Sequence, residues 1–197
     1  MRDKYGVDQD PNCYPNTDTL INLLNIQSES ELDEAELELT SFRLEQFTPD
    51  FSSLTFEYLK QIHFFLFQDI YAWAGQVRTV DISKGDTRFC TTSYIEREAE
   101  KQFAKLANLD NLKGLDKDEF VEHLADFFCE MNIVHPFREG NGRALRLFCE
   151  VLAMQAGYEL SWQGVSKEAW LDANIYGFNV STELLIVIFD RCSMPIE

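Results

Sequence analysis

Apolar side chains recur at three- and four-residue steps along most of the chain, which is the spacing of amphipathic helices. Ser28 and Glu31 form a capping-box pattern before the first such segment, whose apolar face we assign to positions from Leu32 to Phe42 and whose acids we assign to solvent. Residues 54–73 are apolar almost all round, which predicts a central helix. The helices predicted in this way cover residues 28–47, 54–73, 94–107, a segment capped by Asp116 or Asp118 that runs to about 134, and residues 143–156, 167–176 and 182–192.

One segment breaks the helical pattern. In residues 77–90, Val80 and Ile82 fall on one side of a strand, residues 84–86 are typical of a turn, and a short return strand follows. This is the only hairpin that the sequence predicts, and no repeat or linker divides the chain. We therefore expect a single, mostly α domain over residues 1–197 with a small β-hairpin.

Composition and charge then limit the classes of function. The chain has 34 acidic and 17 basic residues and a formal net charge of −17, which disfavours direct contact with nucleic acid or an anionic membrane. The longest strongly apolar run, residues 184–189, is far shorter than the ~20 residues of a membrane helix. The first residues lack the apolar core of a secretory signal, so we expect a cytoplasmic protein. The five cysteines form no CxxC pair, which predicts buried free thiols.

A twelve-residue stretch, HPFREGNGRALR at residues 135–146, is cationic within this acidic chain. Arg138, Arg143 and Arg146 outweigh Glu139, which leaves a net charge of +2 and suggests an anionic ligand. The proline at its second position ends the preceding helix, because proline lacks an N–H and restricts the residue before it. The stretch is therefore predicted to be a loop between two helices.

This loop has the features of a phosphate site. Gly140 and Gly142 allow the N–H groups around Asn141 to turn toward one point, and the next helix adds its positive end there. Arg143 and Arg146 are three residues apart and share a helix face, so both can bind phosphate oxygens. Two such cations favour a di- or triphosphate over a single phosphate.

Two further residues of the loop have candidate chemical roles. Glu139 would be repelled by phosphates unless Mg²⁺ bridged them, which makes it a candidate magnesium ligand. A histidine can accept a proton at physiological pH, which makes His135 the candidate base for an attacking hydroxyl. Each residue type is more often structural on its own, and the prediction depends on their juxtaposition. A P-loop lysine and an HExxH zinc pair are both absent, and Phe137 is predicted to anchor the loop to the core.

At these positions the sequence resembles the Fic family, whose signature HxFx(D/E)GNGRxxR matches HPFREGNGRALR at every specified position. Residues 63–90 resemble the helix and hairpin flap of that family. Residues 4–15 and 157–170 are most similar to the short Fic toxins of bacterial toxin–antitoxin modules. The resemblance implies a Fic-type helical domain with a central helix-loop-helix active site.

The implied activity is transfer of AMP from ATP, with Mg²⁺, to a Ser, Thr or Tyr hydroxyl of a target protein. His135 would be the base and Glu139 the metal ligand, while residues Gly140, Asn141 and Gly142 would form the anion hole. The resemblance places Arg143 on the β-phosphate and Arg146 near the γ-phosphate.

Other positions are weaker candidates for nucleotide contacts. They are Arg138 in the loop and Lys84 and Gly85 in the flap, where the target backbone would dock by strand addition. The adenine pocket stays open, with Asn174 and Tyr176 as guesses from their position in the chain.

The resemblance also predicts how the protein is regulated. Family members are often restrained by a helix bearing Ser/Thr-xxx-Glu-Gly/Asn, whose glutamate pairs with the second arginine of the motif. Glu-Gly occurs here only at Glu139-Gly140, and Glu-Asn does not occur. We therefore predict a separate small antitoxin protein that supplies a glutamate opposite Arg146. In the toxins that the chain resembles, the targets are the ATPase subunits of DNA gyrase and topoisomerase IV.

Two alternatives stay open. One is a Fic-related kinase or phosphocholine transferase that uses the same loop. The other is a nucleotide-binding regulatory module without turnover, although an intact His135 argues against it.

Overall fold

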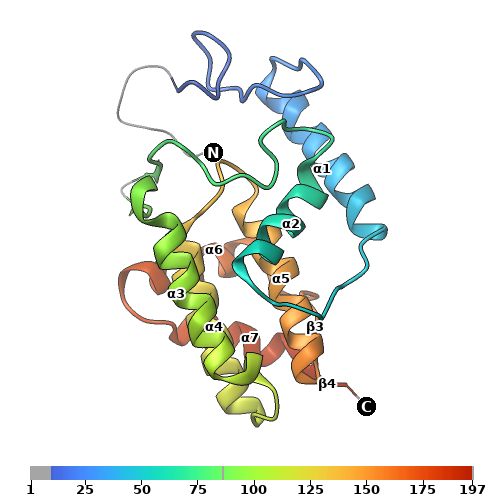
Figure 1. Cartoon of the computed structure of the whole chain (residues 1–197), viewed down its shortest axis with the longest axis vertical. Helices are drawn as coiled ribbons and strands as arrows, with labels where there is room; N and C mark the ends of the chain where they lie inside the picture. Colours follow the sequence, from blue (N-terminus) through green and yellow to red (C-terminus); the bar gives the residue numbers. More distant parts are fainter. Residues whose placement is uncertain (1–9, 86, 197) are drawn as a thin grey trace.

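The computed structural model describes residues 10–85 and 87–196 and is mostly helical (Figure 1). The strands form two antiparallel pairs, β1 (Ser83–Lys84) with β2 (Thr87–Arg88) and β3 (Tyr158–Leu160) with β4 (Ser193–Pro195). The prediction of a mostly α fold with a small hairpin is confirmed. The helices, in chain order, are α1 (Glu29–Glu45), α2 (Phe56–Phe67), α3 (Ile95–Asn108), α4 (Lys117–Val134), α5 (Asn141–Ala156), α6 (Lys167–Asn179) and α7 (Glu183–Cys192), with single 3₁₀ turns at Thr92–Tyr94 and Asp110–Leu112.

Local sequence signals explain where most helices begin and end. Ser28, Asp116 and Ser166 are the N-caps of α1, α4 and α6, and each side chain accepts a hydrogen bond from the N–H three residues later. The helix α5 ends at Gly157, which has a φ of 93° that favours glycine. The predicted boundaries of α3, α4 and α7 agree with the structure to within about two residues.

The observed elements differ from the expected ones in several places. The helix expected over residues 54–73 ends at Phe67, because the chain turns there and the Ile70 carbonyl instead accepts a hydrogen bond from the Leu23 N–H at 2.8 Å. The helix expected to begin near Arg143 begins two residues earlier. The pair β3–β4 was not predicted, because its strands are three residues long and lie far apart in the sequence.

The hairpin expected over residues 77–90 is shorter than predicted. Its paired strands cover only residues 83–84 and 87–88. Asp86 in the expected turn lies outside the described residues, as do residues 1–9 and with them the start of the resemblance at 4–15. Near the base of the hairpin, the guanidinium of Arg78 donates to the carbonyls of Val80 and Cys90. These carbonyls therefore face an arginine and not a neighbouring strand.

The helix α1 buries part of the predicted face, since Leu32 is buried and Leu39 packs against the core, but other positions differ. The pattern assigned Leu32, Ala35, Leu39 and Phe42 to the core, but α1 buries Leu32, Glu36 and Thr40, and Phe42 is 57% exposed. The expectation that all the acids of this helix face solvent is wrong at Glu36, which has partners inside the molecule.

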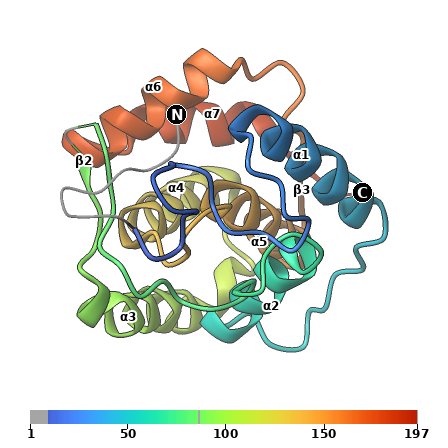
Figure 2. The same ribbon diagram turned by 90° about the horizontal axis from the view of Figure 1, so that it is seen from above.

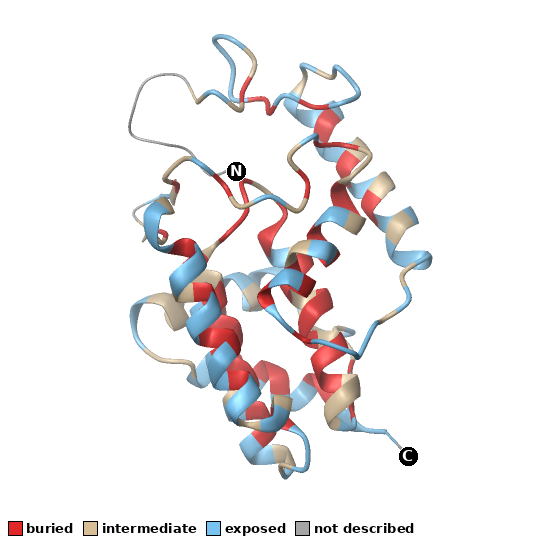
Figure 3. Ribbon diagram, viewed as in Figure 1, coloured by how far each residue is buried: buried red, intermediate tan, exposed pale blue. Residues whose placement is uncertain are grey.

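The helices α4 and α5 lie at the centre of the molecule, surrounded by α1, α2, α3, α6 and α7 (Figure 2). The buried faces of α4 and α5 belong to one cluster of apolar side chains. The outer faces of the surrounding helices are exposed (Figure 3). All five cysteines are free, and all but Cys90 are buried. Over the described residues, the helices are too short or too polar to cross a membrane. Residues 135–140 connect the two central helices.

Candidate active site

His135 lies at the end of α4 in the left-handed conformation, with a φ of 47°. Its Nδ1 is 3.1 Å from the Asn132 carbonyl oxygen, and its ring stacks on Phe89 with 3.8 Å between the centroids. Because a carbonyl can only accept, this contact favours the tautomer with a proton on Nδ1, which leaves the lone pair on Nε2. The side chain is thus oriented as a base requires.

A buried arginine connects His135 to the base of the hairpin. The Nε of Arg78 donates to the His135 carbonyl at 2.8 Å, its backbone N–H donates to the Pro136 carbonyl at 2.9 Å, and its Nη1 donates to Val80 at 2.7 Å. Cys90, at the other end of the hairpin, donates its N–H to the Ile133 carbonyl. These hydrogen bonds connect the base of the hairpin to the histidine, and nothing in the local pattern of the sequence identified this arginine.

A second supporting residue that the sequence did not identify is His63 of α2, which is fully buried. Its Nδ1 accepts from the Gly75 N–H at 2.8 Å, so its Nε2 carries the proton and donates to the Glu139 carbonyl at 2.9 Å. The ring stacks on Phe137 at 3.9 Å, and Phe137 is buried as predicted. Burial lowers the pKa of His63 to about 3, so the ring is neutral at physiological pH and holds the loop by hydrogen bonds alone.

Asn141 closes the loop. Its Oδ1 accepts from the Phe137 N–H at 2.8 Å, and its Nδ2 donates to the Phe137 carbonyl at 2.7 Å. Gly140 beside it has a φ of 79°, and a Cβ at this position would lie 2.3 Å from the Phe67 ring. Only glycine fits here, both by conformation and by space.

The N-terminus of α5 is open to a ligand. No side chain caps this helix, so the first-turn N–H groups at Asn141, Gly142 and Arg143 have no acceptor within the helix. Such an end attracts an anion through these donors and the helix dipole. This arrangement agrees with the phosphate site that the glycines predicted.

The two arginines of α5 have different surroundings. Nη2 of Arg143 forms an ion pair with Glu36 at 2.6 Å and lies 3.6 Å from Glu139. Arg146 lies over the Trp162 ring at 5.8 Å and makes no salt bridge with any described residue. Burial lowers the pKa of Arg146, because the guanidinium has lost part of its hydration. The group stays charged at neutral pH. An anion near Arg146 would compensate this loss of water.

Several candidate residues have other partners or lie elsewhere. Arg138 is buried and forms a salt bridge with Asp10 at 2.6 Å. Its guanidinium therefore already has a partner, and the expected nucleotide contact of Arg138 stays a prediction that this geometry does not support. Lys84 and Gly85 are exposed in the hairpin, and no contact within the described part of the chain links them to the loop. Asn174 accepts from the Asn132 side chain at 3.0 Å, which ties α6 to α4 near His135.

The residues present fit a magnesium ion held through phosphates. Glu139 is partly exposed, and its Oε1 accepts from the Gly140 N–H at 2.9 Å. Its Oε2 has no hydrogen-bond partner among residues 10–85 and 87–196. One carboxylate that presents a free oxygen beside a phosphate site is a common protein contribution to a Mg²⁺ site. No cluster of three or more protein ligands occurs in the described parts of the chain, so such an ion would depend on the phosphates.

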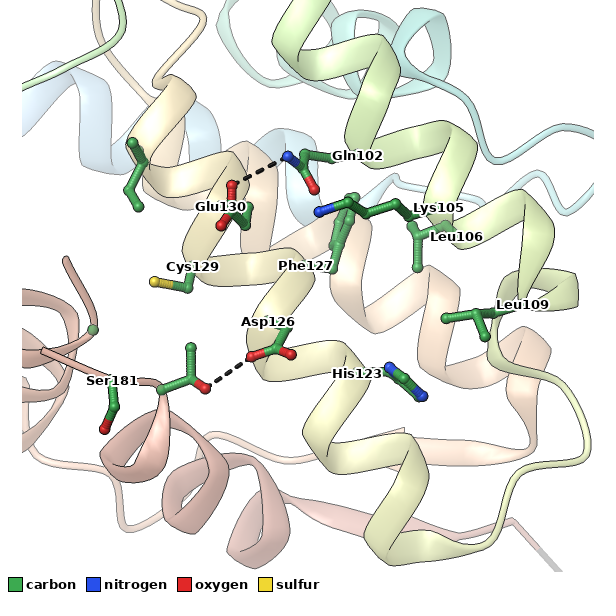
Figure 4. Close-up of a pocket in the computed structure, with 13 residues that line it drawn as sticks. Gln102, Lys105, Leu106, Leu109, His123, Asp126, Phe127, Cys129, Glu130 and Ser181 are labelled. Atoms are coloured by element: carbon green, nitrogen blue, oxygen red, sulfur yellow. Dashed lines mark hydrogen bonds between the residues drawn. The ribbon is translucent and has the colours of Figure 1, made fainter.

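Two cavities adjoin each other on the α3–α4 side of the molecule. The first has a volume of about 410 Å³, and Figure 4 shows Gln102 hydrogen-bonded to Glu130 and Asp126 to a neighbouring side chain along its wall. The second has a volume of about 470 Å³ and is lined by the return strand of the hairpin, α3 and α4. Both contain Gln102, Glu130 and Ile133 in their walls. Phe89, whose ring stacks on His135, is one of the residues that line the second cavity.

The structure is a helical protein built around a helix-loop-helix, in which a histidine precedes a helix N-terminus that no side chain caps. Residues 53–153 match the Fic/DOC family. The chain is 45% identical to the "Probable protein adenylyltransferase Fic" of Escherichia coli, over 97% of this chain and 96% of that protein. It is 36% identical to the protein adenylyltransferase VbhT of Bartonella schoenbuchensis, over 95% of this chain and 40% of that protein. The chain therefore belongs to the Fic/DOC family.

Solved structures agree. The crystal structure of the BepC protein of Bartonella tribocorum, with bound AMPPNP, has a TM-score of 0.87 and 27% identity over 94% of this chain and 97% of that chain. The N-terminal Fic domain of a Bep effector protein of Bartonella quintana, with bound ADP, has a TM-score of 0.88 and 29% identity over 94% of this chain and 95% of that chain. The Fic-type fold expected from the motif is confirmed.

Proposed function

We propose that this protein transfers AMP from ATP to a hydroxyl side chain of a target protein and releases pyrophosphate. The observation that carries the proposal is the arrangement of the loop, in which a histidine with Nε2 as acceptor precedes an uncapped helix end that bears two arginines. The activity named for the relatives in Escherichia coli and Bartonella schoenbuchensis supports it. The nucleotides bound in the two Bartonella crystal structures support ATP as the substrate.

In this reaction His135 handles the proton. Nε2 accepts it from the target hydroxyl as that oxygen attacks the α-phosphate, and the bond between the α-phosphorus and the bridging oxygen breaks. The hydrogen bond from Nδ1 to the Asn132 carbonyl stabilises the imidazolium that forms. The orientation of the His135 ring is thus already fixed before the target binds.

The start of α5 handles the negative charge. The N–H groups of Asn141 and Gly142 and the guanidinium of Arg143 stabilise the phosphates in the transition state, as is general for phosphoryl-type transfer. Arg146 binds the far end of the triphosphate. Glu139 would hold Mg²⁺, which neutralises charge on the phosphates when it is bound.

The target protein docks on the hairpin in this proposal. The chain of the target adds to the strands at Ser83–Arg88, with Lys84 and Gly85 at the docking edge. The stacking of Phe89 on His135 supports this placement, because it puts the hairpin beside the base. The ATPase subunits of DNA gyrase and topoisomerase IV are the first targets to test, and the cytoplasm is the expected compartment, given ATP as substrate and five free thiols.

Regulation by a small antitoxin protein is part of the proposal. Arg146 has lost water and has no salt bridge among the described residues, so a glutamate of a partner could pair with it and exclude the γ-phosphate. Adding such a partner should reduce AMP transfer, and it should lose this effect on an Arg146→Ala variant. A partner that inhibits both forms equally acts elsewhere.

Labelled ATP distinguishes this function from the alternatives. Incubating the protein with bacterial lysate, or with the purified ATPase subunit of DNA gyrase, should transfer label from α-labelled ATP to protein and no label from γ-labelled ATP. Transfer of the γ-label would indicate a kinase. Binding of ATP without transfer of either label to any protein would indicate a regulatory nucleotide-binding module.

A further inference from the structure

Glu36 is a buried carboxylate on a helix whose other acids are exposed or partly exposed. It is 4% exposed, and Glu34 and Glu38 on the same helix face solvent. A buried carboxylate is costly unless it is paired and hydrogen-bonded. Glu36 has both kinds of partner, because its Oε2 accepts from Arg143 Nη2 at 2.6 Å and its Oε1 accepts from the Tyr71 hydroxyl.

The contacts of Glu36 determine how Arg143 lies. Nη2 of Arg143 is bonded to Glu36, and the guanidinium lies over the Phe67 ring with its Cζ 4.6 Å from the centroid. Glu139 approaches the same nitrogen at 3.6 Å. Contacts from α1, from α2 and from the loop thus fix the plane of the guanidinium. Within the described residues, Nε and Nη1 of Arg143 have no hydrogen-bond partner, so these two donor nitrogens remain for a phosphate.

We infer that Glu36 is a positioning residue, which holds the guanidinium of Arg143 in the orientation that binds the nucleotide phosphates. The inference rests on the proposed function, because it assigns Arg143 to ATP. An arginine side chain has several freely rotating bonds, and holding it in one geometry before the ligand arrives reduces the entropy lost on binding. The carboxylate lies behind the guanidinium and is itself bonded to Tyr71, so it orients the cation without occupying the two remaining donors.

A purely structural role predicts a different result. If Glu36 served only to hold α1 against the rest of the fold, its removal would lower the free energy of unfolding but leave the ATP affinity of the folded protein unchanged. If it restrained Arg143 against ATP, its removal would raise the affinity. Of the three roles, only positioning predicts weaker ATP binding and a higher KM, together with rescue by an isosteric side chain.

The test measures ATP affinity by calorimetry, and AMP transfer with α-labelled ATP, in the wild-type protein and in variants at Glu36. Glu36→Ala should lose about tenfold in ATP affinity and raise KM by a similar factor, the size expected for losing one oriented charge-assisted contact. Glu36→Gln keeps an acceptor for Nη2 and should bind ATP much like the wild type. Glu38→Ala, which removes an exposed acid of the same helix, is the matched control and should have no effect.

A double-mutant cycle ties the effect to the arginine. In an Arg143→Ala background, Glu36→Ala should cause no further loss of ATP affinity, because there is no guanidinium left to orient. If Glu36→Ala does not fold, Glu36→Asp replaces it. The shorter side chain keeps the charge but cannot maintain both contacts, so it should also weaken ATP binding.

The outcomes separate the inference from the proposed function. A wild-type protein that transfers AMP, with Glu36→Ala or Glu36→Asp variants that bind ATP as tightly or more tightly, overturns the inference alone. An additive loss in the Arg143→Ala background overturns it as well. A wild-type protein that neither binds ATP nor transfers AMP overturns the proposed function and the inference with it.

Discussion

The buried His63 should make the stability of this protein depend on pH. The folded-state pKa of its ring is about 3, below the ordinary value of 6.5. Between these values the unfolded chain binds a proton that the folded protein does not bind. The stabilising contribution is therefore fully present above pH 6.5 and is lost as the pH falls toward 3.

The size of the effect follows from the two pKa values. Proton linkage to His63 alone should lower the free energy of unfolding by about 2 kcal/mol between about pH 6 and about pH 4.5. Because the ring is 0% exposed, solvent does not screen this effect. The loss also concerns the active site, since the proton-bearing Nε2 holds the Glu139 carbonyl and the Nδ1 that would be protonated holds the Gly75 N–H.

Urea unfolding at both pH values, in the wild type and in His63→Gln, isolates this term. Glutamine retains an amide donor but does not titrate, so every other group contributes equally to both proteins and cancels in the difference. The stability advantage of the wild type over His63→Gln should shrink by about 2 kcal/mol from about pH 6 to about pH 4.5. An advantage that stays constant over this range would refute the assignment of a buried neutral histidine under the loop.

Three substitutions in the loop and its support test the geometry. Gly140→Ala places a methyl group against the Phe67 ring at a positive φ; we expect a loss of about 1–3 kcal/mol in urea unfolding and a loss of AMP transfer, and a wild-type result in both would contradict the tight fit. Asn141→Asp keeps the acceptor for the Phe137 N–H but loses the donor to its carbonyl, so thermal unfolding should show a loss of about 1–3 kcal/mol. The shorter fork-free side chain in Arg78→Lys cannot reach several carbonyls at once. This variant should therefore lower the free energy of unfolding by about 2–4 kcal/mol and also lower AMP transfer. Unchanged transfer in a folded variant would show that the base of the hairpin does not support the site.

Much of the site could be predicted because its residues are contiguous in the sequence. Between His135 and Arg146, the residue types, their spacing and the flanking helices already suggested a base, a metal ligand and a phosphate site. The N-cap Ser28 likewise gave the start of α1 that the structure confirms, and of the two caps that the sequence offered for α4, Asp116 and Asp118, the structure uses Asp116. Local signals of this kind do not depend on what the rest of the chain does.

The missed residues act across long distances in the sequence. Arg78, His63 and Glu36 contact the loop from segments that are 57, 76 and 107 residues away. A buried glutamate on an acidic helix has the same local pattern as a solvated one, and only tertiary packing makes it a partner of Arg143. Helical spacing could not identify Glu36, because its burial is stabilised by an ion pair and not by an apolar side chain.

If His135 is the base, loss of its side chain should stop AMP transfer and spare ATP binding. AMP transfer from α-labelled ATP and the Kd for ATP should be measured on the same preparations of the wild type and His135→Ala. We predict that transfer falls by about 10²–10⁴-fold while the Kd for ATP stays unchanged, because the ring contributes to proton transfer and not to the phosphate site. Labelling that persists in His135→Ala at the wild-type rate would show that His135 is not the base.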